Sequence, residues 1–183
     1  GLKPGGDNGT WFQELAYGPN GFDAARTTLS IGGAPLTQRT EYMPMSPSAN
    51  AGITGALNVQ NTPTFFAGRW GDTNTALDAN AIRGKVAVFT MPALPAAVAG
   101  RPATRGAGNF AGVADNRAVA AGAAGILVVS LDSISQPART AAFAMRTGMH
   151  PTTGAGIGAA AISSAAAAKI FGRPAGDVTI GTV

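Results

Sequence analysis

Cysteine is absent from the 183 residues, and histidine occurs once, at His150. The chain therefore cannot form disulfides, thiolate zinc sites or cysteine nucleophiles, and any site that needs two imidazoles is excluded. The nine Asp and Glu residues are scattered from Asp7 to Asp177, with no Asp-x-Asp or Glu-Glu pair. An acid–base or metal site could form only by long-range convergence. We therefore expect this chain to contain no catalytic, cofactor-binding or metal-binding residues.

Charge is also scarce, because Asp, Glu, Lys and Arg make up only 12% of the chain. The 13 basic residues outnumber the acidic ones and give a net charge of +4, but they are spread along the sequence. Nucleic-acid binding needs several cations along one phosphate track, with aromatic residues to stack bases. No apolar run approaches the roughly 20 residues of a membrane span. The sequence predicts neither a nucleic-acid partner nor a membrane span.

Turn-forming residues are plentiful, with 26 glycines and 12 prolines, while hydrophobic residues reach 45%. A chain of this length and composition can bury a core as one domain with many turns. The heavy use of alanine and glycine is typical of a GC-rich bacterial genome.

The first half of the chain is expected to be largely antiparallel. Residues 26–31 contain alternating β-branched residues and predict a strand that ends at a glycine-glycine turn. Residues 36–46 would return as the second strand of a hairpin. A further strand is predicted at 54–59, followed by a polar loop with aromatic residues over 60–75.

The second half begins with the pattern of a parallel β–α–β unit. Two continuous apolar runs, 86–89 and 126–129, predict strands that are buried on both faces. Between them lie a long loop over 90–111 and an alanine-rich helix over 113–122. Because a helix separates the two strands and a short loop follows it, the order predicts a parallel crossover.

The remainder predicts a third strand and a second helix. After a turn-rich stretch over 130–156, residues 157–162 predict a strand. Ser163 is a good N-cap for a helix over 165–171, and a last strand is predicted at 177–183. We therefore expect a mixed α/β fold with two helices.

Two glycine-rich segments, 106–111 and 154–159, match the loose pattern G-x-G-x-x-(G/A). A dinucleotide site requires this pattern to join a strand directly to a helix. Neither segment does so, and no nucleotide cofactor is predicted.

Aromatic residues offer the candidate contact site. Trp11, Phe12, Phe65, Phe66 and Trp70 could form an exposed recognition patch, or they could anchor small hydrophobic clusters beneath loops. Of these, we select Phe65, Phe66 and Trp70, together with Arg101 and Arg105, as candidates for contact with a peptide or protein.

Three spaced segments resemble the protease-associated (PA) domain. They are residues 82–89, with Gly-Lys-Val before an apolar strand; 116–129, with a helix that runs into Ala-Gly-Ala-Ala-Gly and a second apolar strand; and 157–163, a third strand before Ser163. The resemblance covers residues 41–183. It implies the swivelling β/β/α fold, with a parallel-containing central sheet, an antiparallel sheet and helices on one side.

The opening sequence, GLKPGGDNGTWFQ, is similar to the segment upstream of the inserted PA domain in two-zinc aminopeptidases of metallopeptidase family 28. The resemblance divides the chain into a lead-in with the first hairpin, residues 1–40, and a PA domain, residues 41–183. The zinc ligands of that family would lie after Val183. Zinc is thus expected in the parent catalytic domain, and no cofactor is expected in this fragment.

The resemblance implies a non-catalytic domain of a secreted or periplasmic bacterial zinc aminopeptidase. Such a domain would shape substrate access or mediate contacts, with the parent catalytic domain and peptide or protein substrates as partners. Alternatives are an independent peptide-binding module that uses the loops at 60–75 and 90–112, a PA insert of a subtilisin-like serine protease, and an independent esterase or glycosidase.

Overall fold

The computed structural model describes residues 27–45, 53, 59–72, 74–91, 115–146 and 157–183. Its strands are β1 Ser30–Ile31, β2 Ala34–Pro35, β3 Tyr42–Pro44, β4 Thr64–Arg69, β5 Val86–Thr90, β6 Gly125–Val129 and β7 Ala159–Ile162. Its α-helices are α1 Ala79–Ile82, α2 Arg117–Ala120, α3 Gln136–Arg146 and α4 Ser164–Phe171, and two 3-10 helices are η3 Leu131–Ser133 and η4 Ala175–Asp177. The mixed α/β class is confirmed, and the described part has four α-helices where two were predicted.

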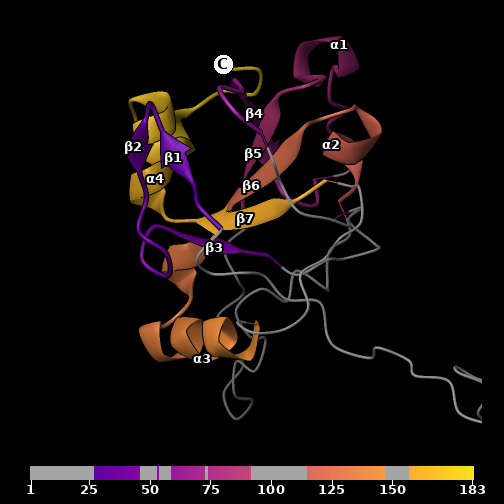
Figure 1. The fold of residues 1–183 in the computed structure, drawn as a ribbon. Helices are drawn as coiled ribbons and strands as arrows, with labels where there is room; N and C mark the ends of the chain where they lie inside the picture. The colour runs from indigo at the N-terminus through magenta and orange to yellow at the C-terminus, as the bar shows by residue number, and fades with distance from the viewer. Residues whose placement is uncertain (1–26, 46–52, 54–58, 73, 92–114, 147–156) are drawn as a thin grey trace, which may run out of the picture.

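The centre of the molecule is a five-stranded sheet in the order β3-β7-β6-β5-β4. Strands β4 to β7 run parallel to one another, and β3 is antiparallel to β7. Each parallel strand therefore pairs with the next one along the chain, and a helix occupies every crossover (Figure 1). The predicted parallel crossover between 86–89 and 126–129 is confirmed, as is the third strand at β7.

Side chains alternate between the two faces of the sheet, and each face has its own cover. On β5, Ala87 and Phe89 join a cluster with α1 and α2, whereas Val86 and Val88 join a cluster with α4 and η4. The short hairpin of β1 and β2 lies on the α4 side (Figure 1). The expectation of helices on one side only is therefore wrong, because α4 packs opposite α2.

The hairpin is shorter than predicted. It pairs Ser30 with Pro35 and Ile31 with Ala34 through a turn at Gly32 and Gly33, whose φ values are +56° and +82°. Two successive positive φ angles are typical of a type I′ hairpin turn, which glycine adopts without strain. The predicted return strand over 36–46 is interrupted, since only β3 within it joins the central sheet.

Three other predictions for irregular or extended segments are wrong. The expected loop over 60–75 contains β4, and the expected turn-rich stretch over 130–156 contains η3 and α3. The expected last strand over 177–183 is instead the end of η4 followed by a turn. Residues 1–26 of the lead-in, most of the strand predicted at 54–59 and most of the loop at 90–111 lie outside the described residues.

The predicted caps of α4 are confirmed. The Ser163 hydroxyl accepts a hydrogen bond from the amide of Ala166 at 3.1 Å, and Gly172 ends the helix with φ +68°. Glycine is suited to this left-handed C-terminal position because it has no Cβ. These caps fix the direction of α4 relative to the end of β7.

Small residues bring α2 close to the sheet. Ala118 and Ala121 are buried against it, whereas Ala120, which lies between them in sequence, is exposed. The turn after the helix uses Gly122, with φ +79°, and its carbonyl accepts a hydrogen bond from the amide of Gly84 at 2.9 Å. The helix thus returns directly into β6.

We expect Ala118→Leu to destabilise the protein by about 1–3 kcal/mol, because extra methylene groups must be forced between α2 and the sheet. The free energy of unfolding in urea measures this effect. Ala120→Leu is the matched control, since it adds the same side chain at an exposed position of the same helix. Equal effects of the two substitutions would contradict close packing at Ala118.

Candidate functional site

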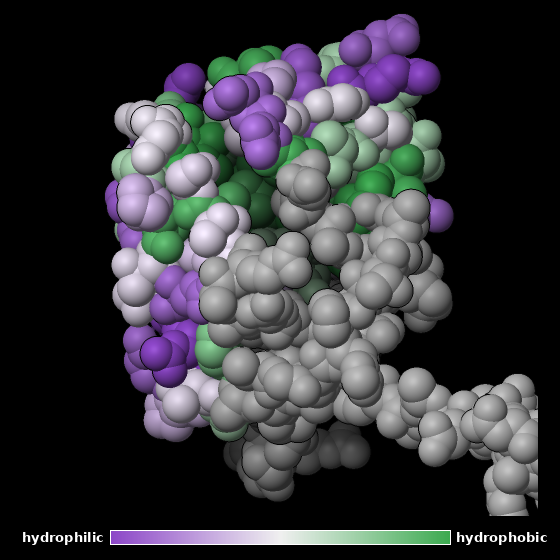
Figure 2. All heavy atoms as spheres, viewed as in Figure 1, coloured by the Kyte–Doolittle hydropathy of each residue, from purple (hydrophilic) through white to green (hydrophobic). Residues whose placement is uncertain are grey.

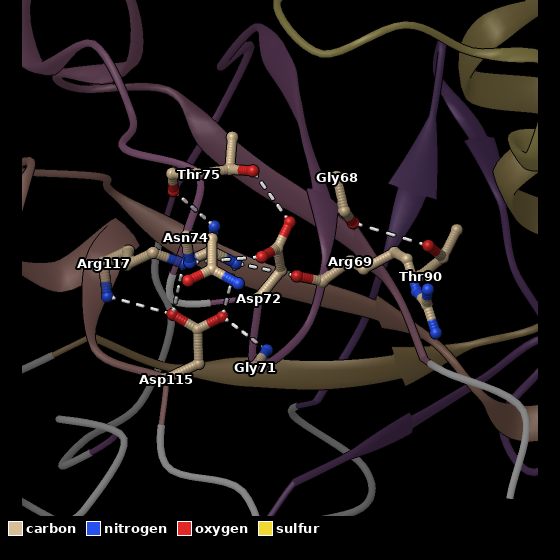
Figure 3. Close-up of polar contacts among 9 residues, drawn as sticks. All are labelled: Gly68, Arg69, Gly71, Asp72, Asn74, Thr75, Thr90, Asp115 and Arg117. Atoms are coloured by element: carbon tan, nitrogen blue, oxygen red, sulfur yellow. Dashed lines mark hydrogen bonds and ion pairs between the residues drawn. The ribbon is translucent and has the colours of Figure 1, made fainter.

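The carboxyl ends of the parallel strands meet at one edge of the sheet, which is the edge where ligands bind in open α/β folds. The most connected polar cluster of the described residues lies there (Figure 3). It joins the end of β4, the turn that follows it and the residues at the start of α2. This cluster is the candidate site.

Asp115 is the centre of the cluster, and its side chain is fully buried. One carboxylate oxygen, Oδ2, accepts hydrogen bonds from the amide of Gly71 at 2.8 Å and from Nη2 of Arg117 at 2.7 Å. The other, Oδ1, accepts from the amide of Arg117 at 3.1 Å and from its Nε at 3.0 Å. Both oxygens are therefore occupied by donors, which compensates for the burial of the charge.

Arg117 extends the cluster by donating hydrogen bonds to two backbone carbonyls at the edge of the sheet. Its Nη1 donates to the carbonyl of Thr75 and its Nη2 to the carbonyl of Arg69, each at 2.7 Å. The guanidinium also lies 5.6 Å from the ring centroid of Phe89 on β5, within cation–π range. The single side chain thus connects α2, the end of β4 and the turn after β4.

The turn itself is closed by Asp72. Its Oδ2 accepts a hydrogen bond from the Thr75 hydroxyl at 2.7 Å, and its Oδ1 accepts from the amide of Asn74 at 3.2 Å. The Thr75 hydrogen bond is the main cause that lowers the pKa of Asp72. This is local turn chemistry, in which an aspartate side chain substitutes for backbone hydrogen bonding.

The ionisation of Asp115 follows from two opposed effects. Burial raises its pKa, but the hydrogen bonds from Arg117 and Gly71 outweigh burial and hold the pKa below its ordinary value. The carboxylate is therefore charged at neutral pH and already saturated with donors. Such a group holds backbone in place and is poorly suited to accept or deliver a proton during a reaction.

Other described carboxylates also have structural partners. Glu41 accepts from Lys169 at 2.5 Å, and this contact is the main cause that lowers its pKa. Asp132 accepts from the amide of Ser164 at 2.6 Å, and Asp78 caps α1 through the amide of Asn80 at 2.9 Å. Within the described ranges, no three His, Asp or Glu side chains are grouped as metal ligands would be.

A shallow groove of about 520 Å³ opens at the same edge, between the ends of β5 and β6 and the start of α4. Its lining is mostly uncharged and apolar: Thr90, Met91, Val129, Ser164, Ala165, Ala168, Pro174, Ala175 and Gly176. The carboxylate of Asp132 already occupies the first amide of α4, which disfavours an anion at this helix end. In the view of Figure 2, apolar residues gather in a recess near the middle of the face.

The aromatic residues selected from the sequence are not exposed. Phe65, Phe66 and Trp70 are all buried. Phe66 packs edge-to-face with Phe171 at 5.6 Å, and Trp70 does so with Phe89 at 5.2 Å. The three therefore anchor the core on both faces of the sheet, and of the two interpretations that the sequence left open, the exposed recognition patch is wrong.

Arg101 and Arg105, the other two residues selected, lie outside the described residues, as does His150. The structure does not bring them into the candidate site or separate them from it. Sequence reasoning missed the Asp115–Arg117 pair, although an aspartate two residues before an arginine at a helix start was a local signal. Its partners on β4 and in the following turn are too distant in sequence to be read from that signal.

No known family, curated protein or solved structure matches the chain in comparisons with known proteins. In the part of the chain that the structure describes, no helix combines the length and apolar character needed to cross a membrane.

We expect Asp115→Asn to destabilise the protein by about 3–5 kcal/mol, because Arg117 would keep a largely buried charge without its counter-ion. The folded-state pKa of Asp115 is lowered, so its stabilising effect is present above the unfolded pKa near about 4 and is lost as the pH falls through the folded value. Urea unfolding between about pH 3 and 7 should therefore show a weaker acid dependence in the variant.

The control for Asp115→Asn is Asp177→Asn, which changes an exposed carboxylate in η4. We expect it to alter the free energy of unfolding by less than about 0.5 kcal/mol. If the two variants lost similar stability, or if Asp115→Asn kept the full acid dependence of the wild type, the structural role of the ion pair would be wrong.

Proposed function

We propose that this chain is a non-catalytic accessory domain of the PA type, from a secreted or periplasmic zinc aminopeptidase, and that it shapes substrate access or mediates peptide and protein contacts. The segments that resemble PA domains support the proposal by their positions. Gly84 and Lys85 lead directly into β5, Gly122 to Ala124 lead from α2 into β6, and Ser163 lies between β7 and α4.

The use of charge at the carboxyl edge of the sheet carries the proposal. In α/β enzymes this edge supplies the groups that touch the substrate. Here Asp115 is buried and Arg117 is largely buried, and both use their hydrogen-bonding groups on the backbone of β4, its following turn and α2. The edge is thereby fixed as a rigid support, which suits a domain that presents a surface.

The groove at this edge favours contact over chemistry as well. Its side chains include the hydroxyls of Thr90 and Ser164 on an otherwise apolar lining, and its volume suits one or two side chains of a peptide or neighbouring domain. An uncharged shallow surface of this kind gains affinity from burial of apolar area.

The experiment compares the purified chain with the complete protein that its gene encodes, using aminoacyl-p-nitroanilides with added zinc. We expect the complete protein to release nitroaniline, to lose this activity with a metal chelator and to keep it with a serine-directed inhibitor. The chain alone should show no turnover above buffer. The sequence after Val183 should contain the zinc-ligand segments of the aminopeptidase.

Each alternative has a separate signature in this experiment. Turnover that follows the 183-residue chain through purification would establish an independent enzyme and overturn the proposal. Loss of the complete protein's activity with the serine-directed inhibitor would indicate a subtilisin-like parent. An independent binding module would have no peptidase segments in its gene, and peptide mixtures at millimolar concentration would shift its amide resonances.

A further inference from the structure

Strand β4 is the last strand of the five-stranded sheet on one side, so its outer edge pairs with no further strand of that sheet. The carbonyl of Pro63 accepts a hydrogen bond from the amide of Val86 at 2.9 Å, and Thr64 is in register with Val86. In a parallel ladder, alternate residues bond to the same neighbour. The backbone groups of Thr64 and Phe66 therefore face away from β5, toward the outside of the sheet.

A short C-terminal segment, residues 179–183, lies on this edge (Figure 1). The amide of Phe66 donates to the carbonyl of Thr182, and the amide of Gly181 donates to the carbonyl of Phe66, both at 2.9 Å. Two tail residues thus face one residue of β4, as in a glycine-containing β-bulge. The tail pairs with one residue of a six-residue strand.

The tail is held in this position by a turn. The amide of Thr182 donates to the carbonyl of Thr179 at 3.2 Å, and Gly181 has φ +94°. A positive φ at this third position is what a type II turn requires of glycine. A Cβ on Gly181 would meet no atom within 4 Å, so a larger residue there would disturb only the backbone of the turn.

One tail side chain fills a notch in β4. A Cβ built on Gly68 would lie 2.8 Å from Cδ1 of Ile180, so the isoleucine reaches into space that only glycine leaves open. Yet Ile180 remains 47% exposed and Val183 67% exposed. The tail therefore covers the edge with side chains that are only partly removed from water, and the backbone groups of an edge strand are able to pair with another chain.

We propose that the outer edge of β4 is a docking site for an extended, uncharged segment of a partner protein that carries a β-branched aliphatic residue opposite Gly68, and that residues 179–183 are its resident competitor. Backbone hydrogen bonds to Thr64 and Phe66 would give affinity, and the notch at Gly68 would give specificity. The inference does not depend on the parent enzyme or on the proposed function.

A partner segment fits this edge better than a second copy of β4 does. The apolar side chains of β4, which are Phe65, Phe66 and Ala67, are buried in its own core. A second β4 therefore has no free aliphatic side chain to place in the notch of the first. The chemistry of the occupant is instead given by the tail, through its backbone donors and acceptors and the branched side chain of Ile180.

The test uses the full chain labelled with nitrogen-15 and a synthetic peptide with the sequence of residues 177–183. The full-chain variant Gly181→Val releases the tail by straining the turn, because a β-branched residue is disfavoured at this positive φ. We expect the peptide to shift the amides of Thr64, Phe66 and Gly68 saturably, with an apparent Kd about tenfold lower in this variant than in the wild type.

The specificity controls address the notch. Adding Gly68→Val to Gly181→Val should abolish binding, whereas adding Gly84→Val should preserve it. Gly68 and Gly84 both have a positive φ, +83° and +72°, but no atom lies within 4 Å of a Cβ built on Gly84. The Gly84→Val substitution therefore tests the effect of backbone strain alone. A peptide with Ile180→Ser should bind at least about tenfold more weakly, because its side chain no longer buries apolar area.

The outcomes separate the occupants of the edge. No saturable shift on β4 in a folded Gly181→Val chain, or equal affinity for the isoleucine and serine peptides, would overturn the proposal. Broadening of the β4 amides that grows with protein concentration without peptide would show that a second copy occupies the edge, and would overturn it too. If Gly181→Val does not fold, Ile180→Ser in the full chain releases the notch without changing backbone freedom, and the same outcomes apply.

Discussion

The ion pair between Asp115 and Arg117 is the contact on which the carboxyl edge of the sheet depends. Burying two opposite charges is costly unless their remaining hydrogen-bonding groups are satisfied. Here the carboxylate accepts from Gly71 as well as from Arg117, and the guanidinium donates onward to Thr75 and Arg69. The pair therefore stabilises the fold by joining the end of β4 to the turn that follows it, whose backbone has no regular ladder of its own.

The same edge shows how the small residues and the ion pair act together. Ala118 lies one residue after Arg117 and packs against the sheet, so the helix start is held by charge and its body by close contact. Phe89 is common to the two contacts, because it lies under the guanidinium of Arg117 and belongs to the same hydrophobic cluster as Ala118. A change in either contact would shift α2 and thereby the strand that follows it.

Local signals predicted β5, β6, β7 and the caps of α4. Each of these strands is a continuous apolar run, and Ser163 and Gly172 act on the helix that they adjoin. The missed elements, β4 and α3, lack the clear apolar pattern of the other elements. Strand β4 has aromatic residues on both faces of the sheet, and these favoured the prediction of a loop with hydrophobic anchors. Helix α3 buries a charged residue, Arg139, in a sequence with few large apolar residues.

The candidate site was beyond sequence reasoning for a different reason. Asp115 and Gly71 are separated by 44 positions, and Arg117 and Arg69 by 48. Periodicity and capping describe neighbours along the chain, whereas this cluster is created when parallel strands bring their carboxyl ends together. The residue types were visible, but the partners that determine their role were not.

The two outer strands of the sheet, β3 and β4, are covered by different segments. The contacts that hold each segment decide which of them a partner strand can replace. At β3, the turn before the strand folds back so that the amide of Arg39 donates to the carbonyl of Tyr42 at 2.8 Å. The guanidinium of Arg39 lies 5.2 Å from the ring centroid of Phe143. The backbone carbonyl of Arg39 accepts a hydrogen bond from the buried Arg139 side chain at 3.4 Å. Helix α3 therefore fixes this cover from outside.

At β4 the cover is the turn over residues 179–182, which is held by two backbone hydrogen bonds to Phe66 and by the side chain of Ile180 over Gly68. Edge strands need such cover because their unpaired backbone groups can pair with another chain. A cover that a second element fixes is held firmly, whereas one that rests on two backbone hydrogen bonds and a half-exposed aliphatic side chain can be exchanged for a longer strand. The contrast between Arg39 and Ile180 thus makes β4 the edge that can open to a partner.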